Sequence, residues 1–324
     1  MPRATIALLN WNGGAFVRPC VQSVLSQSER DVQVIVVDND SRDGSADIME
    51  ALLDDSALNH EVVRLEQNLG ICGGLQVALD RAEGEYFFPF ASDDEMLPDR
   101  VKLQCDQLDS AGPTTHIGAG AVALIGVDGA PLLNWWRRPI TIRPPDYNGV
   151  DPTMNLAFSL PVPPAPGLVF RTAGLRSIGG YDLAAPVEDI DTFRRLVYLG
   201  GSRVVTTNQV VSLYRRHGSN ASSRSDLMGD GLEHTLRTLV ESGVDFGPVR
   251  SQWVDYLEAR SQGYTSPWPA LLVALGAEPL ERSAVRSAGL DVVRSRMSTH
   301  RRVRGCIAFI APTLASRWVG RSNG

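Results

Sequence analysis

The chain has 324 residues, of which 43% are hydrophobic and 21% are charged. This composition is typical of a globular protein with one large core or two smaller ones, and it excludes general disorder. The formal net charge of -6 argues against nonspecific binding of nucleic acid over the whole surface. No apolar run is long enough for a bilayer-spanning helix. The short run at 6–9 is expected to be a first strand and not part of a leader segment.

The first third of the chain alternates between strand and helix patterns. Strands are expected at 5–9, 34–37, 62–65 and 86–90, and helices at 17–25, 45–53, 75–82 and 98–108. The continuous apolar run at 34–37 is typical of a parallel strand that is covered on both faces. Alternation of this kind indicates βαβ units and a mostly parallel sheet.

After Gly112 the pattern changes. Strands are expected at 117–127, 168–170, 204–206 and 210–214, with a short helix that stops at Gly179-Gly180 and a longer one at 188–199. The proline-rich stretch 139–166 is expected to form a loop layer over a site. Helical periodicity dominates from residue 225. We therefore predict a domain at 1–224 and a helical C-terminal region at 225–324.

The C-terminal region contains a strongly basic segment. Between Arg282 and Arg321 there are nine arginines and one acidic residue, so this segment carries +8 and the part before it -14. Arginines beside the apolar run 305–314 are typical of a helix that lies on anionic lipid. The alternative is a helix that packs on the rest of the chain or on a second subunit of a homo-oligomer. We expect a cytoplasmic protein, with peripheral contact at the inner face of the membrane through this segment.

The cysteines and most histidines carry no recognisable motif. Without metal-ligand spacing, the cysteines are predicted to be buried thiols in a reducing compartment. They are Cys20, Cys72, Cys105 and Cys306. Four of the five histidines show no convincing partner in the sequence and are expected at the surface. They are His60, His116, His234 and His300.

Polar residues follow the first four predicted strands at the point where each strand ends. They are Asn10 and Asn12, then Asp38 and Asp40, then Asn68 and Gly70, then Ser92, Asp93 and Asp94. Ligands of open α/β sheets bind outside the carboxyl ends of the strands. Adjacent carboxylates there suit a hard divalent cation and, through it, a diphosphate.

Each of these groups also has a simpler structural explanation. Two acids at a strand end commonly cap a turn, Asp43 fits the N-cap of the following helix, and the glycines fit tight turns. No G-x-G-x-x-G or P-loop pattern occurs in the sequence, so neither a dinucleotide site nor a Walker site is supported.

The order and spacing of several motifs favour the functional explanation. They are Asn10-Trp11-Asn12, the run Val36 to Ser45 (VVDNDSRDGS), Asn68-Leu69-Gly70, Ser92-Asp93-Asp94 with Pro98, Gly179 to Asp182 (GGYD), Glu188-Asp189 and Tyr214 to His217 (YRRH). Over about residues 4–222 the chain resembles the family 2 glycosyltransferases of GT-A fold. The resemblance implies an α/β fold with a mostly parallel central sheet flanked by helices. It also implies inverting transfer of a sugar from a nucleotide diphosphate donor to an acceptor hydroxyl, as in glycan biosynthesis.

The resemblance also implies roles for individual residues. Asp38 matches a position that contacts the base or ribose, and Asp93 matches the last aspartate of the D-x-D motif, which reaches Mn²⁺ or Mg²⁺. Asp189 matches the catalytic base, and His217 a histidine near the metal and diphosphate. The donor site is completed by Asn10, Asn12, Asp40, Asn68, Gly70, Ser92 and Arg216. The sequence does not distinguish UDP, dTDP and GDP donors, or glycan, lipid-linked and protein acceptors; nucleic acid is not expected as a partner.

One position departs from the family pattern. Ala91 occupies the place of the first D-x-D aspartate, so one carboxylate fewer is available to hold the metal. This leaves open a non-enzymatic alternative, a nucleotide-sugar-binding scaffold with weak or no turnover. A second alternative, a sugar-1-phosphate nucleotidyltransferase, needs a glycine-rich N-terminal loop with Arg and Lys. The chain lacks that loop, and Lys102 is its single lysine.

The chemistry of glycosyl transfer fits these residues. The leaving diphosphate must be neutralised, which Asp93 with a cation can do, and the acceptor hydroxyl must lose its proton, which Asp189 can accept. Since Asp189 lies in the first turn of the predicted helix 188–199, the helix dipole is expected to hold it ionised. Arg215, Arg216 and His217 are predicted to form a cationic cluster that meets the diphosphate, or else a solvated basic turn.

Acceptor recognition has the weakest signals. Trp135 and Trp136 are suited to stacking on sugar rings, but tandem tryptophans also occur as small core clusters under long loops. Glu188 is a candidate for the acceptor side, although acidic residues are common at helix N-termini in any case.

Overall fold

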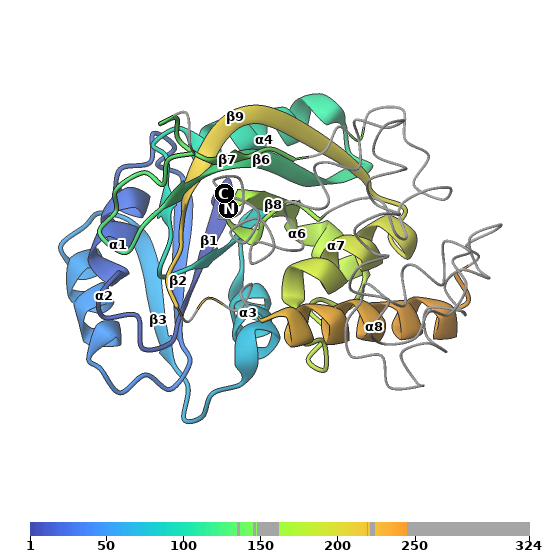
Figure 1. Ribbon diagram of the computed structural model, residues 1–324, viewed down its shortest axis with the longest axis horizontal. Helices are drawn as coiled ribbons and strands as arrows, with labels where there is room; N and C mark the ends of the chain where they lie inside the picture. Colours follow the sequence, from blue (N-terminus) through green and yellow to red (C-terminus); the bar gives the residue numbers. More distant parts are fainter. Residues whose placement is uncertain (135–136, 145–146, 148–161, 219, 221–223, 245–324) are drawn as a thin grey trace, which may run out of the picture.

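The computed structural model describes residues 1–134, 137–144, 147, 162–218, 220 and 224–244. In this part of the chain, nine strands form one sheet in the order β3-β2-β1-β4-β8-β6-β9-β5, with β7 paired to β6 (Figure 1). The strands are β1 (Ala4–Asn10), β2 (Val32–Asp38), β3 (Asn59–Arg64), β4 (Tyr86–Ala91), β5 (Glu95–Met96), β6 (Thr115–Ile125), β7 (Thr141–Ile142), β8 (Leu168–Arg171) and β9 (Arg203–Arg215). The helices are α1 (Val17–Leu25), α2 (Ser45–Asp54), α3 (Gly70–Arg81), α4 (Arg100–Ala111), the 3₁₀ turn η1 (Ala165–Gly167), α6 (Thr172–Ser177), α7 (Glu188–Tyr198) and α8 (Ser225–Glu241).

The N-terminal half of the sheet brings the polar strand ends together. β1 pairs in parallel with both β2 and β4, and β2 pairs in parallel with β3. The register places Asn10 beside Asp38 and Leu9 beside Ala91. Because parallel strands end at the same edge, the turns that follow β1, β2 and β4 all lie along this edge.

The C-terminal half of the sheet is mixed. β8 is antiparallel to β4 and β6, while the long pair β6 and β9 is parallel. The longest ladders are thus parallel, as predicted. The two strands expected at 204–206 and 210–214 are one strand, β9, because an irregularity opposite Ala119–Ala121 absorbs the residues between them.

Helices cover both faces of the sheet, and neighbouring residues of each strand serve different faces. Ala7 and Phe87 pack with α3, α6 and α7 in one cluster. Ile6, Leu8 and Phe88 pack with α1, α2 and α4 in the other. This division explains the continuous apolar runs in the sequence, since both sides of the central strands are buried.

Two predicted helix starts differ from the structure. α3 begins at Gly70, five residues earlier than expected, because the side chain of Asn68 accepts a hydrogen bond from the Gly70 N–H, and Gly70 has a φ of +73°. The glycines that follow belong to the helix. A Cβ at Gly74 would lie 2.3 Å from Leu9 Cδ1, so glycine allows α3 to approach β1. α4 begins at Arg100 and not at Pro98.

The described part of the C-terminal region packs on the rest of the chain. α8 lies alongside α7, on the side away from the strands (Figure 1). Leu236 and Leu239 of α8 are fully buried. The boundary between 224 and 225 stays a prediction. The tandem tryptophans, Cys306 and the basic segment 282–321 lie outside the described residues.

Cys20, Cys72 and Cys105 are buried and free, as predicted. Among the residues that the structure describes, we find no helix with the length and apolar character needed to cross a bilayer.

Candidate active site

Asn10 connects three of the turns at the sheet edge. Its side chain is fully buried, and its Nδ2 lies 2.7 Å from Asp38 Oδ1 and 2.7 Å from Ser45 Oγ. Its Oδ1 accepts a hydrogen bond of 2.8 Å from Ser92 Oγ. A Cβ at Gly13 would lie 2.6 Å from Asn10 Oδ1 and 2.7 Å from Ser92 Oγ, so only glycine leaves room for this network. The ends of β1, β2 and β4 are thereby fixed to one another.

Asp38 takes part in this network from a buried position. It is 4% exposed, and its second carboxylate oxygen accepts a hydrogen bond of 3.1 Å from the Ser41 N–H. Both oxygens are therefore already bonded within the protein. Whether Asp38 contacts a nucleotide directly stays a prediction, and its visible role is to shape the turn after β2.

The other predicted donor-site residues lie in the neighbouring turns. Asn12 and Asp40 both adopt positive φ, 51° and 63°. Asn12 is exposed and joined to the turn after β2, because its N–H donates to Ser41 Oγ at 2.8 Å. Asn68 and Gly70, also exposed, form the turn that starts α3. These residues give the sheet edge a polar rim.

Asp93 and His217 come together from distant parts of the sequence. His217 Nε2 lies 2.8 Å from Asp93 Oδ2, and the two side chains are 12% and 25% exposed. Asn220 accepts a hydrogen bond from the His217 backbone N–H at 2.6 Å. The ring of Phe16 stacks on the imidazole, with 5.1 Å between centroids. An imidazole and a carboxylate are thus held side by side at the surface.

Arg215 is not part of a surface cluster, contrary to expectation. Its side chain is 2% exposed; it pairs with Glu95, and its Nε donates to the Asp93 carbonyl oxygen at 2.8 Å. Its backbone N–H donates to Asp94 Oδ1 at 2.8 Å. The reason is packing, since β9 pairs with β5 here and turns the guanidinium inward over the Phe16 ring. The guanidinium of Arg216 lies over the Tyr214 ring and is partly exposed, and its role in donor binding stays a prediction.

A cavity of about 120 Å³ lies between β4 and the start of α7. Ala91 and Asp94 line it from the β4 side, and Glu188 and Asp189 line it from α7. The structure therefore brings the two acidic motifs, about 95 positions apart, to the same hollow. The turn that carries Asp94 also carries Asp93 and joins the Asn10 network through Ser92.

The carboxyl groups that line this cavity have raised pKa values. Burial, with the neighbouring Asp189 charge, raises the pKa of Glu188 to about 8. Burial raises the pKa of Asp189 to about 6, although the Ile190 N–H and the charge of Arg194 oppose the shift. Burial and the charge of Asp93 raise the pKa of Asp94. Asp189 is thus still mostly ionised in neutral solution, but the helix dipole does not lower its pKa, because desolvation outweighs the dipole.

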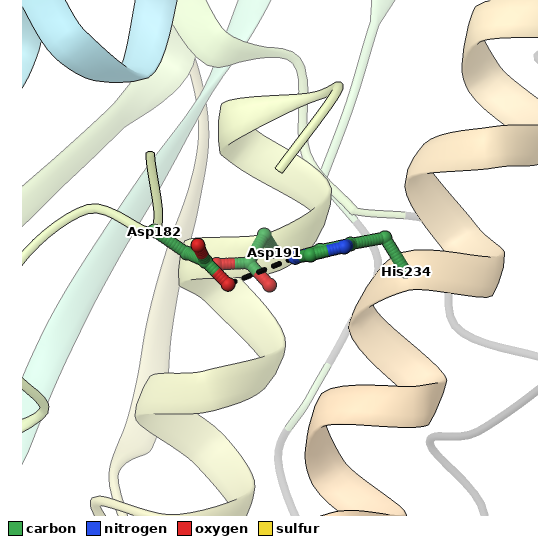
Figure 2. Close-up of side chains that lie close together, drawn as sticks. All are labelled: Asp182, Asp191 and His234. Atoms are coloured by element: carbon green, nitrogen blue, oxygen red, sulfur yellow. Dashed lines mark hydrogen bonds and ion pairs between the residues drawn. The ribbon is translucent and has the colours of Figure 1, made fainter. Parts of the chain in front are cut away.

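A second group of ionisable side chains joins α8 to α7 (Figure 2). His234 Nε2 lies 2.8 Å from Asp182 Oδ2, and Thr235 Oγ1 lies 3.2 Å from Asp191 Oδ1. One ligand atom from each of Asp182, Asp191 and His234 falls within 4.8 Å of the others, so the group could hold a metal ion. However, Asp191 also forms an ion pair with Arg195 Nη1 at 3.3 Å, and the positive charge of Arg195 offsets the negative charge of this carboxylate.

Figure 2 shows that the side chains of this group meet between the two helices. We interpret the group as the anchor of α8. The expectation that His234 and His60 lack partners is wrong, since His60 also pairs with Asp54 at 3.1 Å. The partner of His234 is 52 positions away and could not be found from local spacing.

Sequence reasoning missed three further features of this region. Phe16 packs between His217 and Arg215, and nothing in the sequence around it indicates this role. Tyr181 and Thr192 line the cavity, and their buried hydroxyl groups have no hydrogen-bond partner among the described residues. The acceptor candidates Trp135 and Trp136 lie outside the described residues.

Residues 5–154 match the family model described as Glycosyl transferase family 2. This part of the chain, somewhat less than half of its length, is therefore similar to that family. The match contains β1 to β6 and the Asp93-Asp94 turn, and it ends before α7. The family 2 resemblance drawn from the motifs is thereby confirmed.

Curated relatives agree with this assignment. A Bacillus subtilis protein named for teichuronic acid biosynthesis, TuaG, is 30% identical over 139 residues, which are 43% of this chain and 54% of the relative. The succinoglycan biosynthesis protein ExoO of Rhizobium meliloti is 26% identical over 132 residues, 41% of this chain and 36% of the relative. The matched part of the chain thus spans about half of the first relative and about a third of the second.

Solved structures share the fold over most of the chain. The mannosyltransferase PcManGT from Pyrobaculum calidifontis, in complex with GDP-Man and Mn²⁺, superposes with a TM-score of 0.59 at 19% identity, covering 98% of this chain and 86% of that one. TarS residues 1–349 of S. aureus, in complex with UDP-GlcNAc, also gives a TM-score of 0.59 at 19% identity, covering 99% and 93%. At these identities the likeness shows the fold, which is that of GT-A glycosyltransferases, as predicted.

Proposed function

We propose that this protein transfers a sugar from a nucleotide diphosphate donor to an acceptor hydroxyl, with inversion at the anomeric carbon. The observation that carries the proposal is the shared cavity, which joins the acidic turn after β4 to the acidic pair at the start of α7. A donor in this cavity would have its diphosphate near Asp93 and its sugar near Asp189. The match of residues 5–154 to the family model and the glycosyltransferase name of the Bacillus subtilis relative support the reaction class.

The residues present fit a divalent cation, Mn²⁺ or Mg²⁺, at Asp93 and His217. Such a cation commonly takes one or two protein ligands and completes its shell with phosphate oxygens and water. Asp93 Oδ2 and His217 Nε2 are adjacent and partly exposed, while Ala91 offers no ligand. Asp94 faces inward and accepts the hydrogen bond of Arg215. When bound, the cation would offset the negative charge of the leaving diphosphate.

Asp189 is the proposed base. Its pKa of about 6 makes it a proton acceptor in neutral solution that still binds a proton well enough to remove one from a hydroxyl. Glu188, with a pKa of about 8, stays largely protonated and is suited to donating a hydrogen bond on the acceptor side. Direct attack opposite the leaving diphosphate, without a covalent intermediate, inverts the anomeric centre.

The donor is tested with a thermal-shift panel of UDP, GDP and dTDP and their sugars, with and without Mn²⁺. A ligand that binds the native state alone raises its apparent stability, by about 2.7 kcal/mol at 100 times the dissociation constant. At least one nucleotide should give a shift that grows with Mn²⁺. Product NMR then tests inversion, since a retained anomeric configuration would contradict it.

The scaffold alternative rests on Ala91 alone. It predicts tight nucleotide-sugar binding with neither transfer nor hydrolysis. Slow hydrolysis of the bound donor that depends on Asp189 would exclude it. The accessible pair Asp93 and His217 and the shifted pKa of Asp189 favour the enzyme.

We also propose that the basic segment 282–321 brings the protein to anionic membranes, near a lipid-linked acceptor. The proposal rests on the sequence of this segment, nine arginines beside an apolar run. Liposome co-sedimentation of the full chain and of a version that ends before Arg282 tests it. Equal binding of the two would exclude this role.

A further inference from the structure

α8 contacts the chain on both sides of the acidic pair 188–189. On the earlier side, His234 Nε2 lies 2.8 Å from Asp182 Oδ2, and Figure 2 shows this side chain reaching from α8 to the carboxyl groups. On the later side, Thr235 Oγ1 lies 3.2 Å from Asp191 Oδ1. Thr235 and Asp191 are 0% and 1% exposed, so this contact is shielded from water. The proposed base therefore lies on a stretch of chain that α8 holds at both ends.

A third contact lies directly before the acidic pair. Val187, the N-cap residue of α7, is buried and packs against Gly231 of α8. A Cβ at Gly231 would lie 2.7 Å from Val187 Cγ2 and 2.9 Å from Val187 Cβ. Because the backbone fixes the position of a Cβ, a side chain at residue 231 requires the two helices to move apart at this point. The glycine thus sets the distance between α8 and the residue that precedes Glu188.

Close packing explains why a glycine stands in the middle of α8. In the interior of a helix, glycine is the least favourable residue after proline. Leu236 and Leu239 are fully buried further along the helix and anchor it beyond Gly231. We therefore expect a side chain at residue 231 to displace the start of α7.

We propose, on the basis of the proposed function, that α8 positions the base Asp189, and that Gly231 and Thr235 are its positioning residues. Neither residue lines the cavity, and each acts through a neighbour of the acidic pair. α8 also lies outside the residues 5–154 that match the family model. Misplacing a reacting group by about 1 Å can lower a rate by about 100-fold. The contacts of α8 are therefore needed for the rate and not for donor binding.

Gly231→Ala in the full chain tests this role through donor hydrolysis with Mn²⁺. Water attacks the anomeric carbon, the bond from that carbon to the diphosphate oxygen breaks, and Asp189 accepts a proton from the water. The donors are UDP-GlcNAc, UDP-glucose, GDP-mannose and dTDP-rhamnose. With the donor that the wild type hydrolyses, kcat should fall about 10- to 100-fold and KM should stay unchanged. Arg237→Ala, at an exposed position of α8, is the control and should leave both unchanged.

A second substitution separates positioning from general damage to the fold. Val187→Gly removes both carbon atoms that approach residue 231, and glycine is preferred over valine at an N-cap. In the Val187→Gly background, Gly231→Ala should change kcat by less than about 2-fold, because the steric conflict is absent. An equal loss in both backgrounds, or no loss in either, would overturn the role of Gly231.

Thr235→Val tests the contact with Asp191 without changing the helix spacing. It removes the hydroxyl with little change of shape and should lower kcat about 3- to 10-fold at unchanged KM. Thr235→Ser should retain the wild-type rate. Thr238→Val is the matched control, since the Thr238 hydroxyl donates to the His234 carbonyl oxygen within α8. A wild-type kcat in Thr235→Val would overturn the role of Thr235.

Failure of this inference and failure of the proposed function give different results. If the wild type hydrolyses none of the four donors, or if Asp189→Asn hydrolyses them at the wild-type rate, the proposed function is wrong. If hydrolysis depends on Asp189 and is insensitive to Gly231 and Thr235, the positioning role of α8 is wrong.

Discussion

Arg215 Nε donates a hydrogen bond to the backbone oxygen of Asp93 at 2.8 Å, so a buried cation from β9 holds the acidic turn after β4. The same guanidinium forms an ion pair with Glu95, and the backbone N–H of Arg215 donates a hydrogen bond to the Asp94 side chain. The position of the acidic turn therefore depends on a residue that does not itself face the proposed donor.

Arg215→Met should destabilise the protein by about 3–5 kcal/mol, because it removes the buried cation that pairs with Glu95 and donates to the carbonyl oxygens of Asp93, Gly126 and Val127. Urea unfolding measures this change, and nucleotide binding should be lost at temperatures where the variant is still folded. Arg203→Met, at the exposed start of β9, is the control and should change stability little. Equal effects of the two substitutions would contradict the role of Arg215.

Asp189→Asn should lower transfer by about 10²–10⁴-fold and leave donor binding intact, since an amide cannot accept the acceptor proton. Single-turnover transfer and donor titration measure the two quantities separately. Asp55→Asn, at an exposed position after α2, is the matched control. Full transfer by Asp189→Asn would mean that the base is another residue.

The pH dependence of transfer follows from the pKa of Asp189. Because the base works only when deprotonated, kcat/KM should rise as the pH increases through about 6 and then level off. A profile measured from pH 4.5 to 7.5 at saturating metal checks this. A rise centred near pH 4, the range of an unburied aspartate, would show that the carboxyl is not buried in the active protein.

Glu188 should make the folded state less stable as the pH rises. The pKa of the Glu188 side chain is about 4.5 when it is exposed in the unfolded chain and about 8 in the folded chain. Between pH 4.5 and pH 8 the folded state therefore binds more protons than the unfolded state. The free energy of unfolding then falls with increasing pH. Urea unfolding at pH 5 and pH 8 should show a smaller decrease for Glu188→Gln than for the wild type. Glu66→Gln, at an exposed position, should behave as the wild type.

Ala91→Asp restores the carboxylate that the family motif has and this chain lacks. Ala91 is exposed at the end of β4 and two residues before Asp93, so the new side chain can be accommodated. It should lower the Mn²⁺ concentration for half-maximal nucleotide binding, since a second carboxylate adds a ligand. Metal titration of the nucleotide-induced thermal shift measures this. An unchanged titration would place the cation away from this turn.

The domain boundary predicted at residue 224 can be tested by truncation. A chain that ends at 224 loses Leu236 and Leu239, both fully buried, and the contacts of His234 and Thr235. It should be at least about 3 kcal/mol less stable than a chain that ends at 244, given the burial of two leucines. Equal stability of the two would make α8 an independent appendage.

The elements with a strong apolar period could be predicted from the sequence, because burial on both faces leaves continuous runs in β1, β2 and β4. The single strand β9 could not, since its irregularity depends on the partner β6. Asp93 and His217 were found through a resemblance and not through spacing, as their contact joins positions 124 apart. The hydroxyl groups of Tyr181 and Thr192, which have no partner in the part of the chain that the structure describes, have no signature in the sequence, because pairing depends on the folded surroundings.

β9 extends over 13 residues, about 40 Å of chain, from shortly after the helix that carries Asp189 to the residue two positions before His217. Its parallel ladder to β6 runs from Arg203 to Arg215 and so connects these two ends through one sheet. The Gly200-Gly201 link, which lies outside this ladder, is the position at which we expect a closing motion over a donor to arise. Substitutions at Gly200 and Gly201 should therefore change the rate of product release and leave the proposed reacting groups unaltered.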